Sequence, residues 1–315
     1  MPPVAERLAL AERTMTALVA DAELPPKIGV HPRPDGSFAH AMPAALRPAG
    51  PGSSVADDLL GIKWVTGFSG NRSVGMPAIH ALVVLSDPAT GVPRAILDGG
   101  PITAERTAAV SGVAIARFAP AGARRAAIVG AGVQGRSHLA VLGYALQGVE
   151  VVIYDRHPDR AASLAKAATS TDGIGRCETA TDLRHAIAGA DVVVTAASFT
   201  TPDRRGALTG EWLAPHALVV AIDYATMVAP AIARDSVLFL VDDRGQFLAN
   251  RDAGQFDGYP DPNATLGEAI LAGTARPREG RVLVSHLGVG LADVVFADAI
   301  LRRAEAGGLG TMLGD

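Results

Sequence analysis

A glycine-rich segment in the middle of the chain has the spacing of a dinucleotide-binding loop. The segment AAIVGAGVQG contains Gly130, Gly132 and Gly135 in a G-x-G-x-x-G arrangement. An alanine-rich stretch from Ser137 to Ala145 follows, and the run EVVIYD then ends in a carboxylate at Asp155. In this context the first glycine permits a tight turn, the second lets backbone N–H groups approach a pyrophosphate, and the third lets helix and strand pack closely. We therefore predict dinucleotide binding rather than a glycine turn without a ligand.

The acid at Asp155 bears on which dinucleotide binds. Its carboxylate can accept hydrogen bonds from a ribose diol and would repel a 2′-phosphate, which favours NAD over NADP. The neighbouring Arg156 weakens this inference, because a guanidinium can instead meet a phosphate. We expect NAD as the cofactor, with NADP possible.

Three further residues have side chains suited to amino-acid chemistry. Lys63 lies in the apolar run GIKWV, where an ammonium is costly to bury unless it has a partner or faces a cleft, although it can also point outward from a half-exposed strand. Arg106 lies one turn into a predicted helix, where its guanidinium can clamp a carboxylate or be solvated. Asp223 ends the run ALVVAID, at the strand end where doubly wound sheets bind ligands. It is suited to acid–base work, or it is a capping or loop aspartate.

Metal and thiol chemistry find little support in the sequence. His138, His216 and His286 are not spaced as metal ligands, and no zinc motif is present. Cys177 is the single cysteine, which excludes an intrachain disulfide and favours a small buried side chain over a nucleophile. We predict no metal site.

The composition favours small-molecule chemistry. The chain has 315 residues and a formal net charge of −4, with scattered arginines and no block of like charge, which argues against nucleic acid or a membrane surface as a partner. Charged residues interrupt the N-terminal segment MPPVAERLALAERTM, and no apolar run approaches the roughly 20 residues of a membrane span. We expect a cytoplasmic protein.

The elements that must position these residues fall into two patterns. An amphipathic helix is predicted over Ala5–Asp21, and Lys27–Gly99 alternates short β-like runs with Pro and Gly, which suits a mostly antiparallel sheet. A helix capped by Thr103 should run to Arg117.

From Ala126 onward, Val-, Leu- and Ile-rich runs alternate with helices, the pattern of a parallel sheet covered on both faces. Strands are expected at residues 126–129, 151–155, 190–197, 217–223, 237–242 and 281–288, and helices at 158–169 and 180–188. The stretch Arg244–Ala264 reads as loop-rich and is a candidate lid, and a last helix is expected over Ala292–Ala306.

Five segments together resemble the ornithine cyclodeaminase and mu-crystallin family, in the same order and over most of the chain. They are GIKWVTGFSGN, GGPITAERTAAVSG, IVGAGVQGRSH, ADVVVTAAS and LGVGLADVVFADAI. The resemblance implies an α/β fold in which a Rossmann-type doubly wound parallel sheet is inserted into a second α+β domain formed by both termini. Residues 113–285 would be the NAD(P)-binding domain, and residues 1–112 with 286–315 would bind substrate and form a homodimer.

The same resemblance implies roles for individual residues. Lys63 and Arg106 resemble the pair that holds the substrate α-carboxylate, and Asp223 resembles the catalytic aspartate. The implied cofactor residues are Gly130, Gly132, Gln134, Gly135 and Asp155. We expect the adjacent Val133 and Arg156 to contact the cofactor as well. One position departs from the family pattern, because an early arginine is replaced by Lys27, with Arg33 as a less well aligned substitute. Lysine keeps the charge but lacks the planar fork of arginine.

We therefore predict an NAD(H)-dependent oxidoreductase acting at the Cα–N bond of a small amino acid or its imine, as an amino-acid dehydrogenase or a ketimine reductase. The nicotinamide would lie near Thr195, Asp223 and Gly288, with Asp223, or Lys63 in its place, exchanging the proton. The first alternative is a cyclodeaminase that releases ammonia and recycles its NAD. The second is a non-catalytic small-molecule binding protein like mu-crystallin.

Overall fold

The computed structural model describes residues 1–34, 36–49 and 52–312, and the chain divides into two compact units. Unit 1 consists of residues 1–106 and 289–315, and unit 2 is the inserted segment Thr107–Gly288. The boundaries between the two units fall after Arg106 and after Gly288. The sequence had instead suggested boundaries after residues 112 and 285. Helix α2 (Gly99–Phe118) is continuous across the first break, so no local sequence signal marks it.

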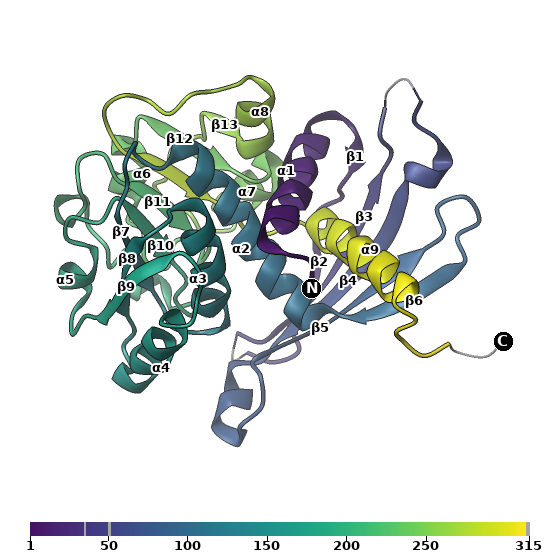
Figure 1. The fold of residues 1–315 in the computed structure, drawn as a ribbon, viewed down its shortest axis with the longest axis horizontal. Coiled ribbons are helices and arrows are strands. Elements are labelled where there is room, and N and C mark those ends of the chain that lie inside the picture. Colours follow the sequence, from purple (N-terminus) through teal and green to yellow (C-terminus); the bar gives the residue numbers. More distant parts are fainter. Residues whose placement is uncertain (35, 50–51, 313–315) are drawn as a thin grey trace. The chain divides into compact units, whose positions relative to one another are not determined.

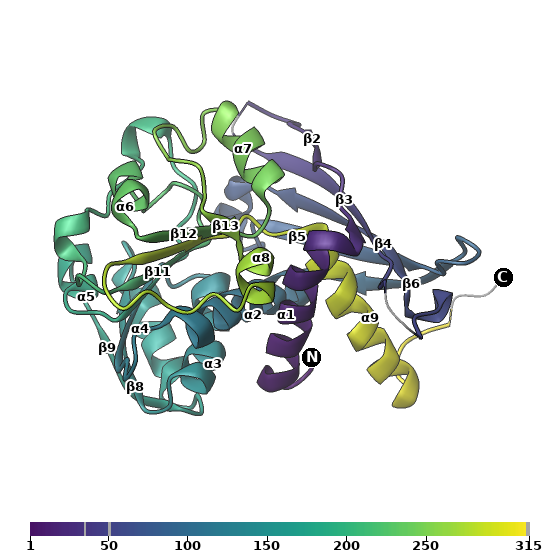
Figure 2. The ribbon, with the colours of Figure 1, turned by 90° about the horizontal axis from the view of Figure 1, so that it is seen from above.

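Unit 1 is built on an antiparallel sheet that carries Lys63. The strands follow the order β1-β3-β4-β5-β6, with β2 paired to β3. Their bounds are β1 Ala22–Glu23, β2 Ile28–Val30, β3 Phe38–Leu46, β4 Leu59–Gly67, β5 Ile79–Ser86 and β6 Pro93–Asp98. Helix α9 (Gly290–Ala306) packs on β3, β4 and β5, and α1 (Val4–Ala20) lies beside it (Figures 1 and 2). The predicted N-terminal helix and antiparallel sheet are confirmed.

Strand β4 buries a lysine and exposes large apolar side chains. Lys63 and Val65 are buried and share the face that packs on α9, whereas Leu60 and Trp64 are 37% and 46% exposed. An outward-pointing Lys63, the alternative that the sequence left open, is therefore wrong. Apolar side chains lie on both faces of this strand, with Val65 beside Lys63 on the covered face and Leu60 and Trp64 on the open one.

Unit 2 is a doubly wound parallel sheet, which confirms the predicted α/β fold class. Its strand order is β13-β12-β14-β11-β10-β7-β8-β9, and every pairing is parallel. The strand bounds are β7 Arg125–Val129, β8 Val149–Tyr154, β9 Ile174–Thr179, β10 Val192–Thr195, β11 Leu218–Ala221, β12 Leu238–Val241, β13 Ala264–Thr265 and β14 Val282–Ser285. Chain order reverses between β7 and β10, and ligands of doubly wound sheets bind at such a switch point. Sequence reasoning missed β9 because this edge strand is polar.

Helices cover both faces of the sheet in unit 2 (Figure 2). Their bounds are α3 Val133–Ala145, α4 Pro158–Ala168, α5 Leu183–Ile187, α6 Pro230–Asp235, α7 Arg244–Asp252 and α8 Leu266–Leu271. Helices α5, α6 and α7 share one apolar core with the sheet, while α3 and α4 lie on the other face. Among the described residues, no helix is long and apolar enough to span a bilayer.

Two predicted elements need correction. Helix α2 begins at Gly99 rather than at Thr103, because the Asp98 carboxylate accepts a hydrogen bond from Gly100 N (2.9 Å) and caps the helix early. The stretch Arg244–Ala264 begins with a helix, α7, because Asp243 caps it by accepting from Gln246 N, and only residues 253–263 are loop. Buried Phe247 then anchors α7 in the core of unit 2.

Candidate active site

The glycine-rich loop joins β7 to α3 and leaves space for a ligand. Gly130 has a φ of +109°, and a Cβ there would lie 2.4 Å from Ala196 O. A Cβ on Gly135 would lie 2.2 Å from Gly130 O, so both positions exclude side chains. Gly132 differs, because a Cβ there would meet nothing within 4 Å, and the next residue, Val133, is 71% exposed. The N-terminus of α3 thus presents backbone N–H groups and the positive end of the helix dipole, which fits a pyrophosphate.

Gln134, in the first turn of α3, adds an unsatisfied group to this loop. Its Oε1 atom is buried and has no hydrogen-bond partner among the described residues. A buried acceptor of this kind is costly unless a ligand or water meets it. The loop therefore fits a polar ligand such as a dinucleotide.

Asp155 follows β8 and folds back onto the same loop. Its Oδ2 accepts from Ala131 N (2.8 Å) and its Oδ1 from His157 N (2.9 Å). Each oxygen keeps further acceptor capacity that a ribose hydroxyl can use. The exposed Arg156 donates from Nε to His157 Nε2 (3.2 Å).

Asp223 lies just beyond β11 and is 2% exposed. Thr195, the last residue of β10, donates from Oγ1 to Asp223 Oδ1 (2.9 Å), and Ala197 N donates to Oδ2 (3.0 Å). Burial raises the pKa of Asp223 to about 7, against the lowering effect of these two hydrogen bonds. Asp223 lies in the loop after β11, as one alternative had it, but it is buried and caps no helix, and its carboxyl group can exchange protons near neutral pH.

The residue after this carboxyl group is strained. Tyr224 has a φ of +58°, and among the described residues it is the one non-glycine with a positive φ. Its ring packs edge-on against Phe199 and stacks on Phe256, with centroid separations of 5.1 and 5.8 Å. Phe199 is 63% exposed, so an aromatic surface begins beside Asp223. Sequence reasoning missed these aromatic residues, for which the only signals were a tyrosine after Asp223 and a phenylalanine in a loop.

Lys63 and Arg106 converge on a carboxylate that sequence reasoning did not single out. Asp293, in the first turn of α9, is fully buried. Its Oδ2 lies 2.5 Å from Lys63 Nζ, and its Oδ1 accepts from Arg106 Nε at 3.0 Å. Lys63 Nζ also donates to Thr103 Oγ1 at 3.5 Å. Since Lys63 and Arg106 are 1% and 5% exposed, the solvated alternatives for both are wrong.

Burial and charge act in opposite directions on this cluster. Burial lowers the pKa of Lys63 to about 7, although the Asp293 carboxylate opposes that effect. Burial alone would raise the pKa of Asp293, but the charges of Arg106 and Lys63 outweigh it and hold that pKa below its usual range. Asp293 is therefore ionised at neutral pH, while Lys63 gains and loses its proton there.

Lys27, the residue in place of the expected arginine, lies within electrostatic reach of the cluster. Its charge contributes to lowering the pKa of Lys63. His40 on β3 pairs with Val65 on β4 and has a pKa of about 4, because of burial and then of the charges of Lys27, His31 and Lys63. His40 is thus uncharged at neutral pH, and Lys27 remains a candidate contact for a substrate carboxylate.

Two histidines that the sequence suggested were isolated meet on one serine in unit 2. His138 Nδ1 lies 2.6 Å from the carbonyl oxygen of Gln134 and donates to it, so its Nε2 accepts from Ser111 Oγ (2.8 Å). Ser111 Oγ in turn accepts from His286 Nε2 (2.8 Å). Burial lowers the pKa of His138 to about 4, so this imidazole is uncharged at neutral pH.

The predicted cofactor residue Gly288 is held by a neighbouring carboxylate. Its N–H donates to Asp242 Oδ2 (2.7 Å), as does the N–H of Leu287 (2.9 Å). Asp242 follows β12 and Gly288 follows β14, so the ends of two adjacent strands are tied together.

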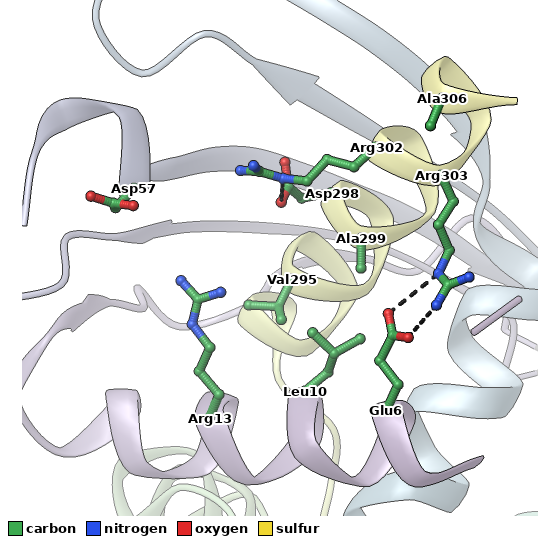
Figure 3. Close-up of a pocket in the computed structure, with 10 residues that line it drawn as sticks. All are labelled: Glu6, Leu10, Arg13, Asp57, Val295, Asp298, Ala299, Arg302, Arg303 and Ala306. Carbon is green, nitrogen blue, oxygen red and sulfur yellow. Dashed lines mark hydrogen bonds and ion pairs between the residues drawn. The ribbon is translucent and has the colours of Figure 1, made fainter. Parts of the chain in front are cut away.

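A groove between α1 and α9 in unit 1 contains none of the predicted residues. Its volume is about 490 Å³, and its walls carry Arg13, Asp57 and an ion pair between Glu6 and Arg303 (Figure 3). Asp298 and Arg302 in the same groove pair with each other at 2.7 Å. Charges of opposite sign thus neutralise one another along this groove. Among the residues that the structure describes, no three His, Cys, Asp or Glu side chains gather as metal ligands would.

Most of the chain matches the model of one protein family. The model of the ornithine cyclodeaminase/mu-crystallin family matches residues 5–308. The chain belongs to this family, which confirms the resemblance seen in the sequence motifs.

Individual relatives cover most of the chain. The nodulation efficiency protein NfeD of Rhizobium meliloti is 35% identical over 296 residues, which are 92% of this chain and 87% of that protein. The ketimine reductase mu-crystallin of Mus musculus is 32% identical over 261 residues, 82% of this chain and 80% of that protein. The structure of Thermococcus litoralis Δ1-pyrroline-2-carboxylate reductase in complex with NADH and L-proline aligns with a TM-score of 0.86 and 25% identity, over 99% of this chain and 96% of that one.

Proposed function

We propose that this protein is an NAD(H)-dependent imine reductase that acts on the Cα–N bond of a small imino acid or, in reverse, of the matching amino acid. The observation that carries the proposal is Asp223, a buried carboxyl group with a pKa of about 7 at the carboxyl end of β11. Two relatives reduce C=N bonds according to their names, the mouse ketimine reductase and the Thermococcus pyrroline-2-carboxylate reductase.

Reduction of an imine adds a hydride to carbon and a proton to nitrogen. Bound NADH would supply the hydride. Asp223 would supply the proton to nitrogen and take it back during amine oxidation. Hydrogen bonds from Thr195 Oγ1 and Ala197 N help to fix the carboxyl group, while its proton affinity stays near neutral pH.

The substrate carboxylate would bind to Lys63 and Arg106. A guanidinium and an ammonium held together bind and orient a carboxylate. Lys27 would add a third positive charge in place of the family arginine. The NAD(H) itself would be held by the loop Gly130–Gly135, with Asp155 on the ribose, and by Thr195 and Gly288 near the nicotinamide.

The assembly we propose is a homodimer through the open face of the unit 1 sheet. Trp64 pairs with Leu82 on the neighbouring strand, and Leu60 and Ile96 lie on the same face. These four side chains are 37–60% exposed. An apolar sheet face of this kind is rarely left in water, and a second copy of the same face is a self-complementary cover.

A substrate panel tests the proposed reaction. Cyclic imino acids, and 2-oxo acids with ammonia or amines, are supplied with NADH, and amino acids are supplied with NAD⁺. NADH absorbance and free ammonia are followed together. We expect NADH consumption with cyclic imino acids, with no ammonia released, and a loss of at least about 100-fold in Asp223→Asn. The variant shows that the activity belongs to this site rather than to a contaminant.

Other outcomes of the panel define the alternatives. Ammonia release from a diamino acid with no net change in NADH would identify a cyclodeaminase. Binding of cofactor and carboxylate ligands without turnover of any substrate would identify a binding protein. Either result would overturn the proposal.

A further inference from the structure

We propose that Asp293 is a positioning residue, a built-in counter-anion that holds Lys63 and Arg106 in one arrangement and leaves the Nη edge of Arg106 to the substrate carboxylate. The inference rests on the proposed function, because it assumes that this pair binds a carboxylate.

The fold places Asp293 against the sheet with little freedom. Gly290 begins α9, and a Cβ there would lie 2.6 Å from Met42 O, so the first turn of the helix packs directly on β3. Met42 pairs with Lys63 across β3 and β4. The close approach at Gly290 therefore sets the height of Asp293 over Lys63.

The atoms used by Asp293 determine what remains for a ligand. Its two oxygens are divided between the cations, with Oδ2 on Lys63 Nζ and Oδ1 on Arg106 Nε. Nη1 and Nη2 of Arg106 form no hydrogen bond or ion pair with the described residues. These two atoms form the edge of a guanidinium that receives a carboxylate in bidentate fashion.

The charge of the cluster with Lys63 protonated also favours an anion. With Lys63 protonated, two buried positive charges face one buried negative charge, and the nearby groups are Lys27, which adds positive charge, and His40, which is uncharged at neutral pH. An excess buried charge is costly, and a purely structural ion pair would not carry it. One substrate carboxylate brings the Lys63–Arg106–Asp293 cluster to neutrality.

The test uses the scarcity of lysine in this chain. Lys27, Lys63 and Lys166 are the only lysines, so protein grown with ¹³Cε-lysine has three resolvable NMR signals, assigned with Lys27→Arg and Lys166→Arg. In Asp293→Asn the titration midpoint of Lys63 should fall by about one to three pH units, because the opposing charge within 4 Å is lost. Asp298→Asn is the matched control, since Asp298 is also buried on α9 but pairs with Arg302. It should leave the Lys63 midpoint unchanged.

The same variants are compared in steady-state kinetics. Protonated Lys63 binds the carboxylate, so KM should rise as the pH increases through the Lys63 midpoint, and in Asp293→Asn this rise should begin at a correspondingly lower pH. Below that pH, KM should still exceed the wild-type value by about 10-fold, because Arg106 is no longer held. If Asp293→Asn does not fold, Asp293→Glu is used in its place. This variant keeps the negative charge, so the titration midpoint of Lys63 should be retained, but its carboxylate is displaced, so KM should rise.

An unchanged Lys63 midpoint in Asp293→Asn, or an unchanged KM in Asp293→Glu, would overturn the inference. The lysine titration needs no substrate. Failure of the proposed reaction is therefore distinguishable from failure of the role assigned to Asp293.

Discussion

Replacing Thr195 by valine tests how the structure sets the proton affinity of Asp223. Thr195 Oγ1 donates to Asp223 Oδ1 at 2.9 Å, and both side chains are buried. A hydrogen bond to a charged group contributes about 1.5 to 3 kcal/mol, and one to a neutral group contributes about 0.5 to 1.5 kcal/mol. Removing the Thr195 hydroxyl therefore destabilises the ionised form of Asp223 by about 1 to 1.5 kcal/mol more than the protonated form. At about 1.4 kcal/mol per pH unit, the pKa of Asp223 should rise from about 7 to about 8 in Thr195→Val.

The assay is the pH dependence of kcat in the direction of amine oxidation. Asp223 must be ionised to accept the proton, so kcat should increase with pH through its pKa, and this limb should move upward by about one pH unit in the variant. Where Lys63 only binds the substrate carboxylate, its deprotonation at higher pH weakens substrate binding and does not produce a rising limb in kcat.

Thr209→Val is the matched control, because Thr209 Oγ1 is buried without a hydrogen-bond partner among the described residues. It should leave the limb in place. A rising limb that stays where it is in Thr195→Val would refute the assignment of Asp223 as the proton acceptor, and Lys63 would then be the first candidate to replace it.

Four further substitutions probe other parts of the structure. Asp223→Asn should lower kcat by about 100-fold or more and leave cofactor affinity nearly unchanged. The same variant should be more stable than the unmodified protein above pH 7. The pKa of Asp223 is about 7 in the native state against 3.8 in the unfolded chain, so ionisation of this carboxyl group lowers the free energy of unfolding by up to about 4 kcal/mol, and this loss grows from about pH 4 to pH 7. Urea unfolding of both proteins at several pH values measures the difference. Arg106→Lys should lower kcat/KM by roughly 10- to 100-fold, since a lysine cannot contact both Asp293 and a substrate carboxylate as the guanidinium does. Asp155→Ala should reduce the difference between the affinities for NAD(H) and NADP(H), which calorimetry measures. Equal affinities in the unmodified protein would mean that Arg156, rather than Asp155, determines the choice of cofactor. Trp64→Glu should convert a homodimer to a monomer in light scattering at micromolar concentration, and a monomeric unmodified protein would contradict the proposed interface.

Local patterns in the sequence were sufficient to predict most of the architecture. Glycine spacing between an apolar strand and a helix has few structural solutions, because both the tight turn at Gly130 and the close contact at Gly135 exclude a side chain. Continuous apolar strands separated by helices likewise require a parallel sheet with two covered faces. The limits of short or unusually capped elements were less predictable, as at Gly99, where the preceding Asp98 caps α2.

The sequence by itself determined which residues had the right chemistry, namely a rare lysine in an apolar strand, an arginine on a helix and an aspartate at a strand end. Only the tertiary structure decided their surroundings. The direction in which Lys63 points depends on which face of β4 is covered by α9, a helix that lies more than two hundred residues later in the chain. Asp293 meets Lys63 and Arg106 for the same reason, and no spacing rule connects residues on three separate elements. The proton affinity of Asp223 also depends on burial and on a hydroxyl group from the neighbouring strand, which are properties of packing rather than of sequence order.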